Sequence, residues 1–297
     1  MMRRCVVAVI VAGLVSAVVC SSAARAQSGN NAPAFVTVET LAQGKIKSLP
    51  AGNVWFSIHE YHQDPGAAYG PISALPWIVY TLHGVSTISS SSFPTRSVAP
   101  GEAAFIPALV PHTSSNVEGR VGTGAIALGL IVLVIVLCAA TWLRASLRRV
   151  VIPALSVVLI AGGVLTLTGA TANHWYVFAV RPDFQRTLVM PVPYGHVVFE
   201  SPDVSPRPAV PYTEKLSAVT IPPGARYNAL DVSSPVMIIV VEGSASVQVG
   251  GKTEQLGSGG AAFAQAGGAL TVVNPGSDTV QVLDFALTPS SAAPAAT

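Results

Sequence analysis

The chain has 297 residues, of which 51% are hydrophobic and only 10% are charged, and its formal net charge is +2. This composition is more apolar than that of a typical soluble domain, so segments able to cross a membrane are expected. Basic residues form no cluster outside the short segments beside these apolar runs, which excludes a nucleic-acid-binding protein.

The first 26 residues have the pattern of a secretory signal peptide. Arg3 and Arg4 precede an apolar run, and Ala24-Arg25-Ala26 has the small-x-small pattern of a cleavage site. We predict a signal peptide over residues 1–26, and a retained anchor is the alternative. A lipoprotein signal through Cys20 is disfavoured because Val19 stands where a small residue is expected.

Residues 27–120 are predicted to form a first β domain. Short alternating runs rich in valine, isoleucine and threonine are separated by glycine and proline. Such runs favour strands closed by tight turns.

A pair of uncharged runs, 123–143 and 150–172, follows this region. Each run is long enough as a helix to cross a bilayer, so residues 121–172 are predicted to form a transmembrane hairpin. The arginines between the runs favour a cytoplasmic loop from Arg144 to Arg149. The protein is therefore predicted to lie in the cell membrane with both β domains extracytoplasmic.

Residues 173–182 resemble the last strand of the second β region in pattern. We predict that they form the final strand of the first domain and that the hairpin is inserted into the loop before it, because loop tips tolerate insertions best. The alternative is that they are the fraying end of the second membrane run. Residues 183–289 are predicted to form a second β domain, and residues 290–297 are predicted to form a disordered tail.

The two β regions repeat the same frame of turn residues, with spacings that differ by at most one residue between anchors. The frame consists of Pro65-Gly66, Pro76, Gly84, Gly101, Ala103-Ala104-Phe105 and Asn116 in the first region, and of Pro223-Gly224, Pro235, Gly243, Gly259, Ala261-Ala262-Phe263 and Asn274 in the second. Two copies of one β unit are the simplest explanation, since glycine and proline fix turns that other residues would strain.

This frame resembles the cupin superfamily of small jelly-roll barrels. Gly101, Pro107, His112 and Asn116 have the spacing of the second cupin motif, with Leu109 in place of its inner glycine. The resemblance implies a bicupin, that is, a mainly β protein of two jelly-roll barrels, here with the transmembrane hairpin added. Bicupins pack their barrels within one chain or in a homodimer, so a homodimer is expected to be possible.

The resemblance does not bring the usual metal ligands with it. In the second copy, Leu230, Val232, Val236 and Leu270 stand at the ligand positions, and in the first copy Ile72 and Trp77 fall near them. These side chains offer no lone pairs for a divalent cofactor, which needs three or four N or O donors.

His112 occupies the one remaining ligand position, and it has two interpretations. It is either a polar residue at the barrel mouth or one ligand of a divalent metal that also uses His59 or His62. His59 and His62 are three residues apart on a predicted strand, so they are expected to point to opposite faces.

The first barrel is also a candidate site for a small molecule. Its expected lining residues are His112, Trp77, Tyr80 and Phe105, although aromatic residues at strand spacing are also typical of a core.

The leading hypothesis is a membrane-anchored, extracytoplasmic and non-catalytic bicupin that binds a small molecule or an envelope protein. The alternative is a metal-dependent cupin enzyme, a dioxygenase or isomerase that uses His112. A transporter is disfavoured because the apolar runs carry no ionisable residue in their interiors.

Overall fold

The computed structural model describes residues 35–49, 51–72, 75–116, 172–186, 195–206, 210–229 and 233–290. The strands among these residues form four antiparallel sheets. The only other regular element in the same residues is a single 3₁₀ turn, η1 (Asp183–Gln185). The prediction of a mainly β protein is confirmed.

Three predicted segments lie outside the described residues. They are the signal peptide predicted at 1–26, residues 121–171 of the hairpin predicted over 121–172, and residues 291–297 of the tail predicted over 290–297. The predicted localisation in the cell membrane is corrected, because the part of the chain that the structure describes contains no helix long and apolar enough to span a bilayer. That prediction rested on the composition of two uncharged runs, and the described residues fold as strands.

The first barrel is built from β2 to β10. Its strands are β2 (Val54–Gln63), β3 (Ala68–Ile72), β4 (Trp77–His83), β5 (Ser86–Ser90), β6 (Arg96–Val98), β7 (Ala103–Ile106), β8 (His112–Asn116), β9 (Asn173–Pro182) and β10 (Gly195–Glu200). One sheet, called here the β2 sheet, has the order β10-β2-β9-β4-β7, and the sheet opposite it has the order β3-β8-β5-β6.

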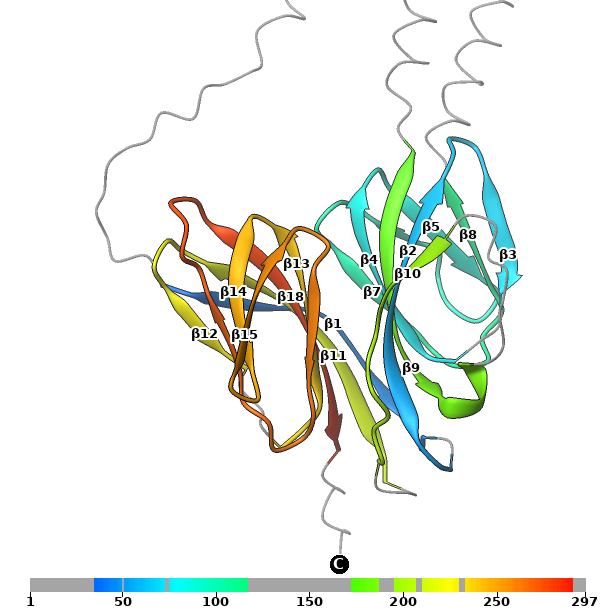
Figure 1. Ribbon diagram of the computed structural model, residues 1–297. Coiled ribbons are helices and arrows are strands. Elements are labelled where there is room, and N and C mark those ends of the chain that lie inside the picture. The colour runs from blue at the N-terminus through cyan, green and yellow to red at the C-terminus, as the bar shows by residue number, and fades with distance from the viewer. Residues whose placement is uncertain are drawn as a thin grey trace, which may run out of the picture. The chain divides into compact units, whose positions relative to one another are not determined.

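The second barrel repeats this plan with β1 and the strands from β11 onward. Its strands are β1 (Thr37–Ile46), β11 (Tyr212–Ile221), β12 (Arg226–Asn228), β13 (Val236–Glu242), β14 (Ser244–Val249), β15 (Lys252–Gly257), β16 (Ala261–Ala264), β17 (Leu270–Val273) and β18 (Val280–Pro289). The β11 sheet has the order β1-β11-β18-β13-β16, and its partner has the order β12-β17-β14-β15. Each barrel is therefore a double-sheet jelly roll (Figure 1). The strand orders of the two barrels correspond strand by strand.

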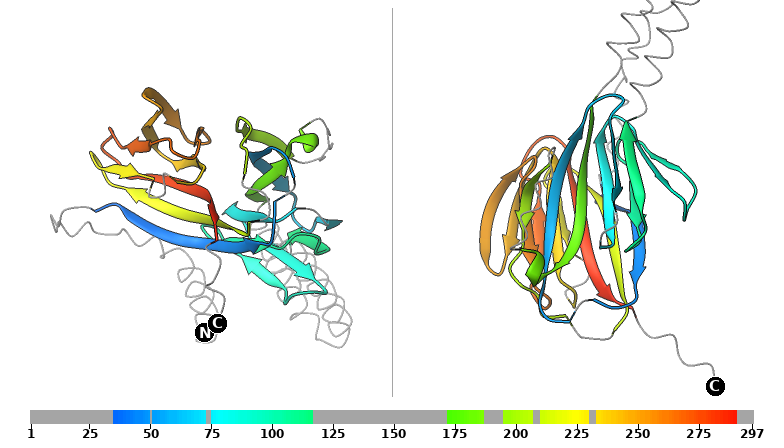
Figure 2. Two further views of the ribbon diagram at one scale, coloured as in Figure 1. Left: turned by 90° about the horizontal axis from the view of Figure 1, so that it is seen from below. Right: turned by 90° about the vertical axis from the view of Figure 1, so that its right-hand side faces the viewer.

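The barrels exchange their leading strands. β1 comes before the first barrel in the sequence, but it pairs along its length with β11 of the second barrel, from Thr37 opposite Thr220 to Ile46 opposite Tyr212. Figure 2 shows the blue β1 running beside the yellow-green β11. β10 comes before the second barrel, and it pairs with β2 of the first. Neither barrel is therefore built from one uninterrupted half of the sequence.

The repeated turn residues form the same hydrogen bonds in both barrels. The backbone N–H of Gly66 donates to the carbonyl of Asn116 over 2.9 Å, and Gly224 donates to Asn274 over 2.9 Å. The side-chain amides of Asn116 and Asn274 donate to the carbonyls of Gln63 and Ile221 at the ends of β2 and β11. The repeated frame is therefore scaffolding, because the same bonds form in the copy that lacks the histidine.

The hydrophobic core has three parts. One lies inside the first barrel around Val79, Ile88 and Trp175, and one lies inside the second barrel around Val219, Ile238 and Val272. The third part joins the β2 sheet to the β11 sheet, where Phe56 and Phe178 each contact Phe285 with ring centroids 5.6 Å apart. The β2 sheet therefore has one face toward the barrel interior and one toward the second barrel.

Candidate functional site

Strand alternation divides the side chains of β2 and β9 between the two faces of the β2 sheet. Tyr61 and Trp175 lie on the inner face and pack in the core of the first barrel, whereas Phe56 and Phe178 lie on the outer face. Because successive side chains point to opposite sides of a strand, Ser57, His59 and Arg181 also belong to the inner face.

Polar groups on the inner face surround one end of the barrel interior. Nε of Arg181 donates a hydrogen bond of 2.9 Å to Oγ of Ser57. Nε2 of His59 is buried and has no hydrogen-bond partner among the described residues. Burial lowers the pKa of His59 to about 4, and the nearby guanidinium of Arg181 acts in the same direction. His59 is therefore a neutral imidazole near a half-buried cation.

Burial also lowers the pKa of Arg181, against the opposing influence of Tyr61 and Glu200. No carboxylate lies within ion-pair distance of Arg181 in the described part of the chain. The first barrel therefore carries a partly desolvated positive charge that a small anion could neutralise.

Aromatic side chains form a large part of the barrel interior beside these polar groups. The rings of Tyr61 and Trp175 stack with centroids 5.7 Å apart, and the ring of His59 stacks on Tyr61 at 6.3 Å. Trp77 meets His112 edge to face at 5.3 Å. Nε1 of Trp77 is buried and, within the described ranges, has no hydrogen-bond partner.

His112, the residue that the cupin spacing singled out, is buried at the start of β8. Its Nδ1 lies 3.0 Å from the carbonyl of Val110. Because a carbonyl oxygen only accepts, Nδ1 is the donor in this hydrogen bond. Among the described residues, His112 belongs to no group of three potential metal ligands.

Tyr80 and Phe105, predicted to line the same pocket, lie on the outer face of the β2 sheet instead. Trp77 and Tyr80 are separated by three positions on one strand, and an odd offset places side chains on opposite faces. Phe105 packs against Gly44 of β1, where an added methyl group would fall 2.2 Å from the phenyl ring. These two residues therefore join the barrels and do not face the barrel interior.

The interior of the second barrel is apolar at the two described positions where the cupin motifs place ligands. Val236 and Leu270 are both buried in its core. The polar pair inside this barrel is Tyr227 and Asp284, in which the tyrosine hydroxyl donates to Oδ2 of the aspartate. Burial raises the pKa of Asp284, although this hydrogen bond and Lys215 act in the opposite direction.

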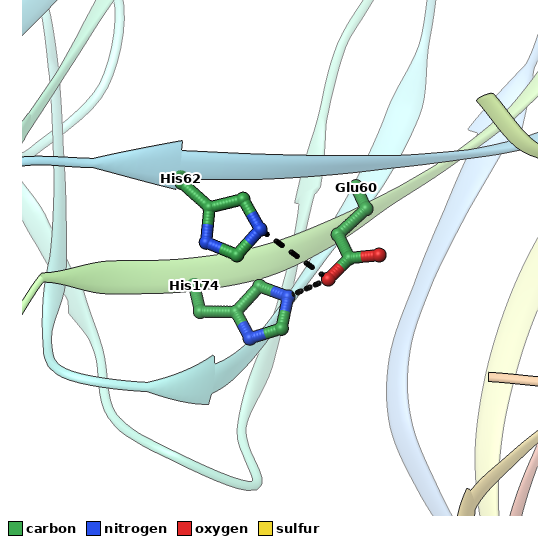
Figure 3. A group of neighbouring side chains, drawn as sticks. All are labelled: Glu60, His62 and His174. Carbon is green, nitrogen blue, oxygen red and sulfur yellow. Dashed lines mark hydrogen bonds and ion pairs between the residues drawn. The ribbon is translucent and has the colours of Figure 1, made fainter. Parts of the chain in front are cut away.

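A second candidate site lies on the outer face of the β2 sheet, near the end of β2 and the start of β9. Glu60 and His62 come from β2, and His174 comes from β9, directly opposite His62 in the strand register. Nε2 of His62 lies 3.5 Å from Oε1 of Glu60, and Nε2 of His174 contacts the same oxygen (Figure 3). His59 is absent from this group because it points into the barrel.

Two further histidines flank the group. Nε2 of His196 on β10 lies 3.0 Å from the other carboxylate oxygen of Glu60. The ring of His83 on β4 lies 5.7 Å from that of His174. Burial lowers the pKa of His174, and Glu60 acts in the opposite direction. Burial also raises the pKa of the neighbouring Tyr176 to about 12.

His62 is a candidate ligand from the sequence alone, but its partners in this group are not. The spacing Glu60-x-His62 was the available signal, since residues two apart on a strand share a face. His174 could not be paired with them from the sequence, because it is 112 positions from His62 and only the β2–β9 register brings the two together.

No family model matches the chain, and no curated protein matches it. The chain is similar in structure to AerE from Microcystis aeruginosa, with 9% sequence identity and a TM-score of 0.46 over 84% of this chain and 98% of that one. YhaK from Escherichia coli matches with 10% identity and a TM-score of 0.45, over 84% of this chain and 94% of the other. A cupin 2 conserved barrel domain protein from Leptotrichia buccalis matches with 9% identity and a TM-score of 0.38, over 87% and 92% of the two chains.

The strand order of the chain itself defines each barrel as a double-sheet jelly roll, the architecture that includes the cupins.

Proposed function

We propose that the chain is a small-molecule-binding bicupin and that the interior of its first barrel recognises an organic anion. The ligand class is a carboxylate attached to an aromatic or apolar body. The observation that carries this proposal is the half-buried guanidinium of Arg181 near His59, whose Nε2 has no partner in the described residues.

The charge of Arg181 supports a carboxylate ligand. Of its polar atoms, Nε is engaged by Ser57, which leaves the planar end of the guanidinium to bind a carboxylate through parallel hydrogen bonds. A partly buried cation gains more from such a partner than an exposed one does, because the surroundings screen the attraction less.

The aromatic residues support an apolar or aromatic body. The stacked rings of Tyr61 and Trp175 make this part of the barrel interior aromatic, and the indole N–H of Trp77 is a buried donor without an acceptor among the described residues. Binding sites of small molecules combine such rings with a few fixed polar groups. A cation, N–H donors and ring faces are the chemistry of recognition, so the proposal is limited to binding.

The test is calorimetric titration of the purified full-length chain with benzoate and with benzamide. The two probes share one ring and differ in charge, so the comparison isolates the contribution of the carboxylate. We expect benzoate to bind at least tenfold more tightly than benzamide. Equal affinities, or no binding of benzoate, would refute recognition of a carboxylate.

Matched arginine variants locate the site. Arg181→Met keeps most of the side-chain volume and is expected to remove the preference for benzoate. Arg96→Met removes an exposed arginine from β6 of the same barrel and is expected to leave both affinities unchanged. An undiminished preference in Arg181→Met would place the binding site elsewhere.

A further inference from the structure

The outer face of the β2 sheet carries a second site that is independent of the proposed ligand site. The side chains of this second site project from the outer face of the β2 sheet, whereas His59 and Arg181 lie on its inner face. Neither site therefore requires the other. The residues are Glu60, His62 and His174, and they lie where the ends of β2 and β9 meet.

The strand register places these three residues together. His62 and His174 are direct partners across the antiparallel pair of β2 and β9. Their rings stack with centroids 4.2 Å apart. Glu60 lies two residues before His62 on β2 and therefore on the same face. Three donors are thus positioned by paired strands and not by a loop.

The separations of the donor atoms fit one ion. One nitrogen from each imidazole and one oxygen of Glu60 all lie within 4.8 Å of one another. Ligands at about 2.0–2.2 Å from a tetrahedral ion are separated by roughly 3.3–3.6 Å, so small side-chain rotations are sufficient to close the set. In Figure 3 the Nε2 atoms of both rings are directed toward the carboxylate of Glu60.

His196 provides the support that metal ligands usually have. Its Nε2 lies 3.0 Å from Oε2 of Glu60, the oxygen that the other two histidines do not contact. A hydrogen bond to one carboxylate oxygen orients the other toward an ion. Glu60 is therefore held from both sides, with a side-chain exposure of only 15%.

We propose that Glu60, His62 and His174 bind a divalent transition-metal ion, with Zn²⁺ as the best chemical match. Two imidazoles and one carboxylate are a known ligand set for tetrahedral zinc, and the fourth position is then taken by water. The side chain of His62 is 56% exposed, so the fourth position is reached from solvent. The site is distinct from the inside of the barrel, where the cupin motifs place a metal.

The experiment uses the full-length chain without a histidine tag, stripped of metal with a chelator. Zn²⁺ is titrated against a chromophoric competitor, and Co²⁺ is used as a probe whose visible absorption reports coordination geometry. We expect one ion per chain and Co²⁺ bands typical of four-coordinate nitrogen and oxygen ligation. Zn²⁺ should also raise the melting temperature, because a ligand that binds only the folded state stabilises it.

Two exposed histidines on either side of His174 give a matched pair of variants. His62→Ala removes a proposed ligand and is expected to weaken Zn²⁺ binding at least a hundredfold and to abolish the Co²⁺ bands. His83→Ala removes the neighbour outside the set and is expected to change the affinity less than twofold. His196→Ala is expected to weaken binding by about 10–100-fold, as removal of a supporting partner does.

Several outcomes would overturn the proposal. One is wild-type protein that binds no stoichiometric Zn²⁺. Another is equal affinity in His62→Ala and the wild type, which would assign the ion to other surface histidines. Near-ultraviolet circular dichroism confirms that each variant is folded, so that loss of binding in His62→Ala is not loss of structure.

Discussion

Glu214 is a buried carboxyl group in the layer that joins the two barrels, and its replacement tests how that layer is stabilised. It lies on β11 between Gly44 of β1 and Leu287 of β18, and its exposed fraction is 0%. Neither carboxylate oxygen forms a well-aligned hydrogen bond among the described residues, and the backbone of Val180 makes only a weak polar contact with the group. Burial raises its pKa well above the ordinary value, and the backbone of Val180 opposes this only in part.

The expected effect of Glu214→Met is stabilisation. Leaving a buried polar group unpaired costs about 1–3 kcal/mol, and methionine fills a similar volume without that cost. We therefore expect the free energy of unfolding at pH 7 to rise by about 1–3 kcal/mol. For a chain of this size, the melting temperature should rise by roughly 2–12 °C.

The pH dependence gives the reasoning a second test. Because the pKa of Glu214 is higher in the folded state, the folded protein holds a proton that the unfolded chain releases. The contribution of this bound proton to stability is therefore complete below the ordinary glutamate pKa of about 4.3. It is lost as the pH rises through the higher pKa that Glu214 has in the folded protein. Glu214→Met removes this loss, so its advantage over the wild type should grow with increasing pH.

The assay monitors thermal unfolding by circular dichroism at a series of pH values from about 5 to 8. Glu254→Met serves as the control. Glu254 is exposed on β15, and its replacement should change the stability by less than about 0.5 kcal/mol. A lower melting temperature for Glu214→Met would refute the argument. Parallel pH profiles for this variant and the wild type would refute it equally.

Other positions give further predictions. Gly44→Ala places a methyl group 2.2 Å from the ring of Phe105, so the free energy of unfolding, measured by denaturant titration, should fall by about 1–3 kcal/mol. The control is Gly257→Ala, whose added methyl group meets nothing within 4 Å and should change the free energy of unfolding by less than about 0.5 kcal/mol. Equal effects of the two changes would count against the packing argument. Tyr227→Phe removes the hydroxyl that donates to Asp284, so the free energy of unfolding should fall by about 1–3 kcal/mol. The pKa of Asp284, measured by NMR titration, should rise further because the carboxylate loses a donor. An unchanged pKa would contradict this role of the hydroxyl.

The strand-rich fold and the repeated frame could be predicted because their signals are local. Gly66 and Gly224 adopt positive φ angles of 78° and 71°, a conformation that glycine adopts without strain, and so they mark the same turn in both copies. The exchange of β1 could not be predicted, since its alternation of side chains suits an edge position in either barrel. Strand pairing between distant segments is not encoded in either segment alone.

The candidate sites were predictable only in part, for the same reason. The sequence identified His112 and Trp77, and the structure places their rings in contact inside the first barrel. The prediction that Tyr80 lines the barrel interior was wrong, because hydrophobicity alone does not indicate which face of a sheet a side chain lies on. Its odd offset from Trp77 on the same strand does. The proximity of His62 and His174 depends on the register of β2 and β9, which is not evident from the sequence of either strand.

The exchanged β1 strand has a consequence for synthesis. Ile46 and its partner Tyr212 are 166 residues apart, so translation at about 5–20 residues per second leaves β1 without its partner for roughly 8–33 seconds. During that interval the nascent strand exposes unpaired backbone groups, which is the condition that invites mispairing and chaperone capture. A destabilising substitution in β1 would then impair the folding of the second barrel, which is synthesised last.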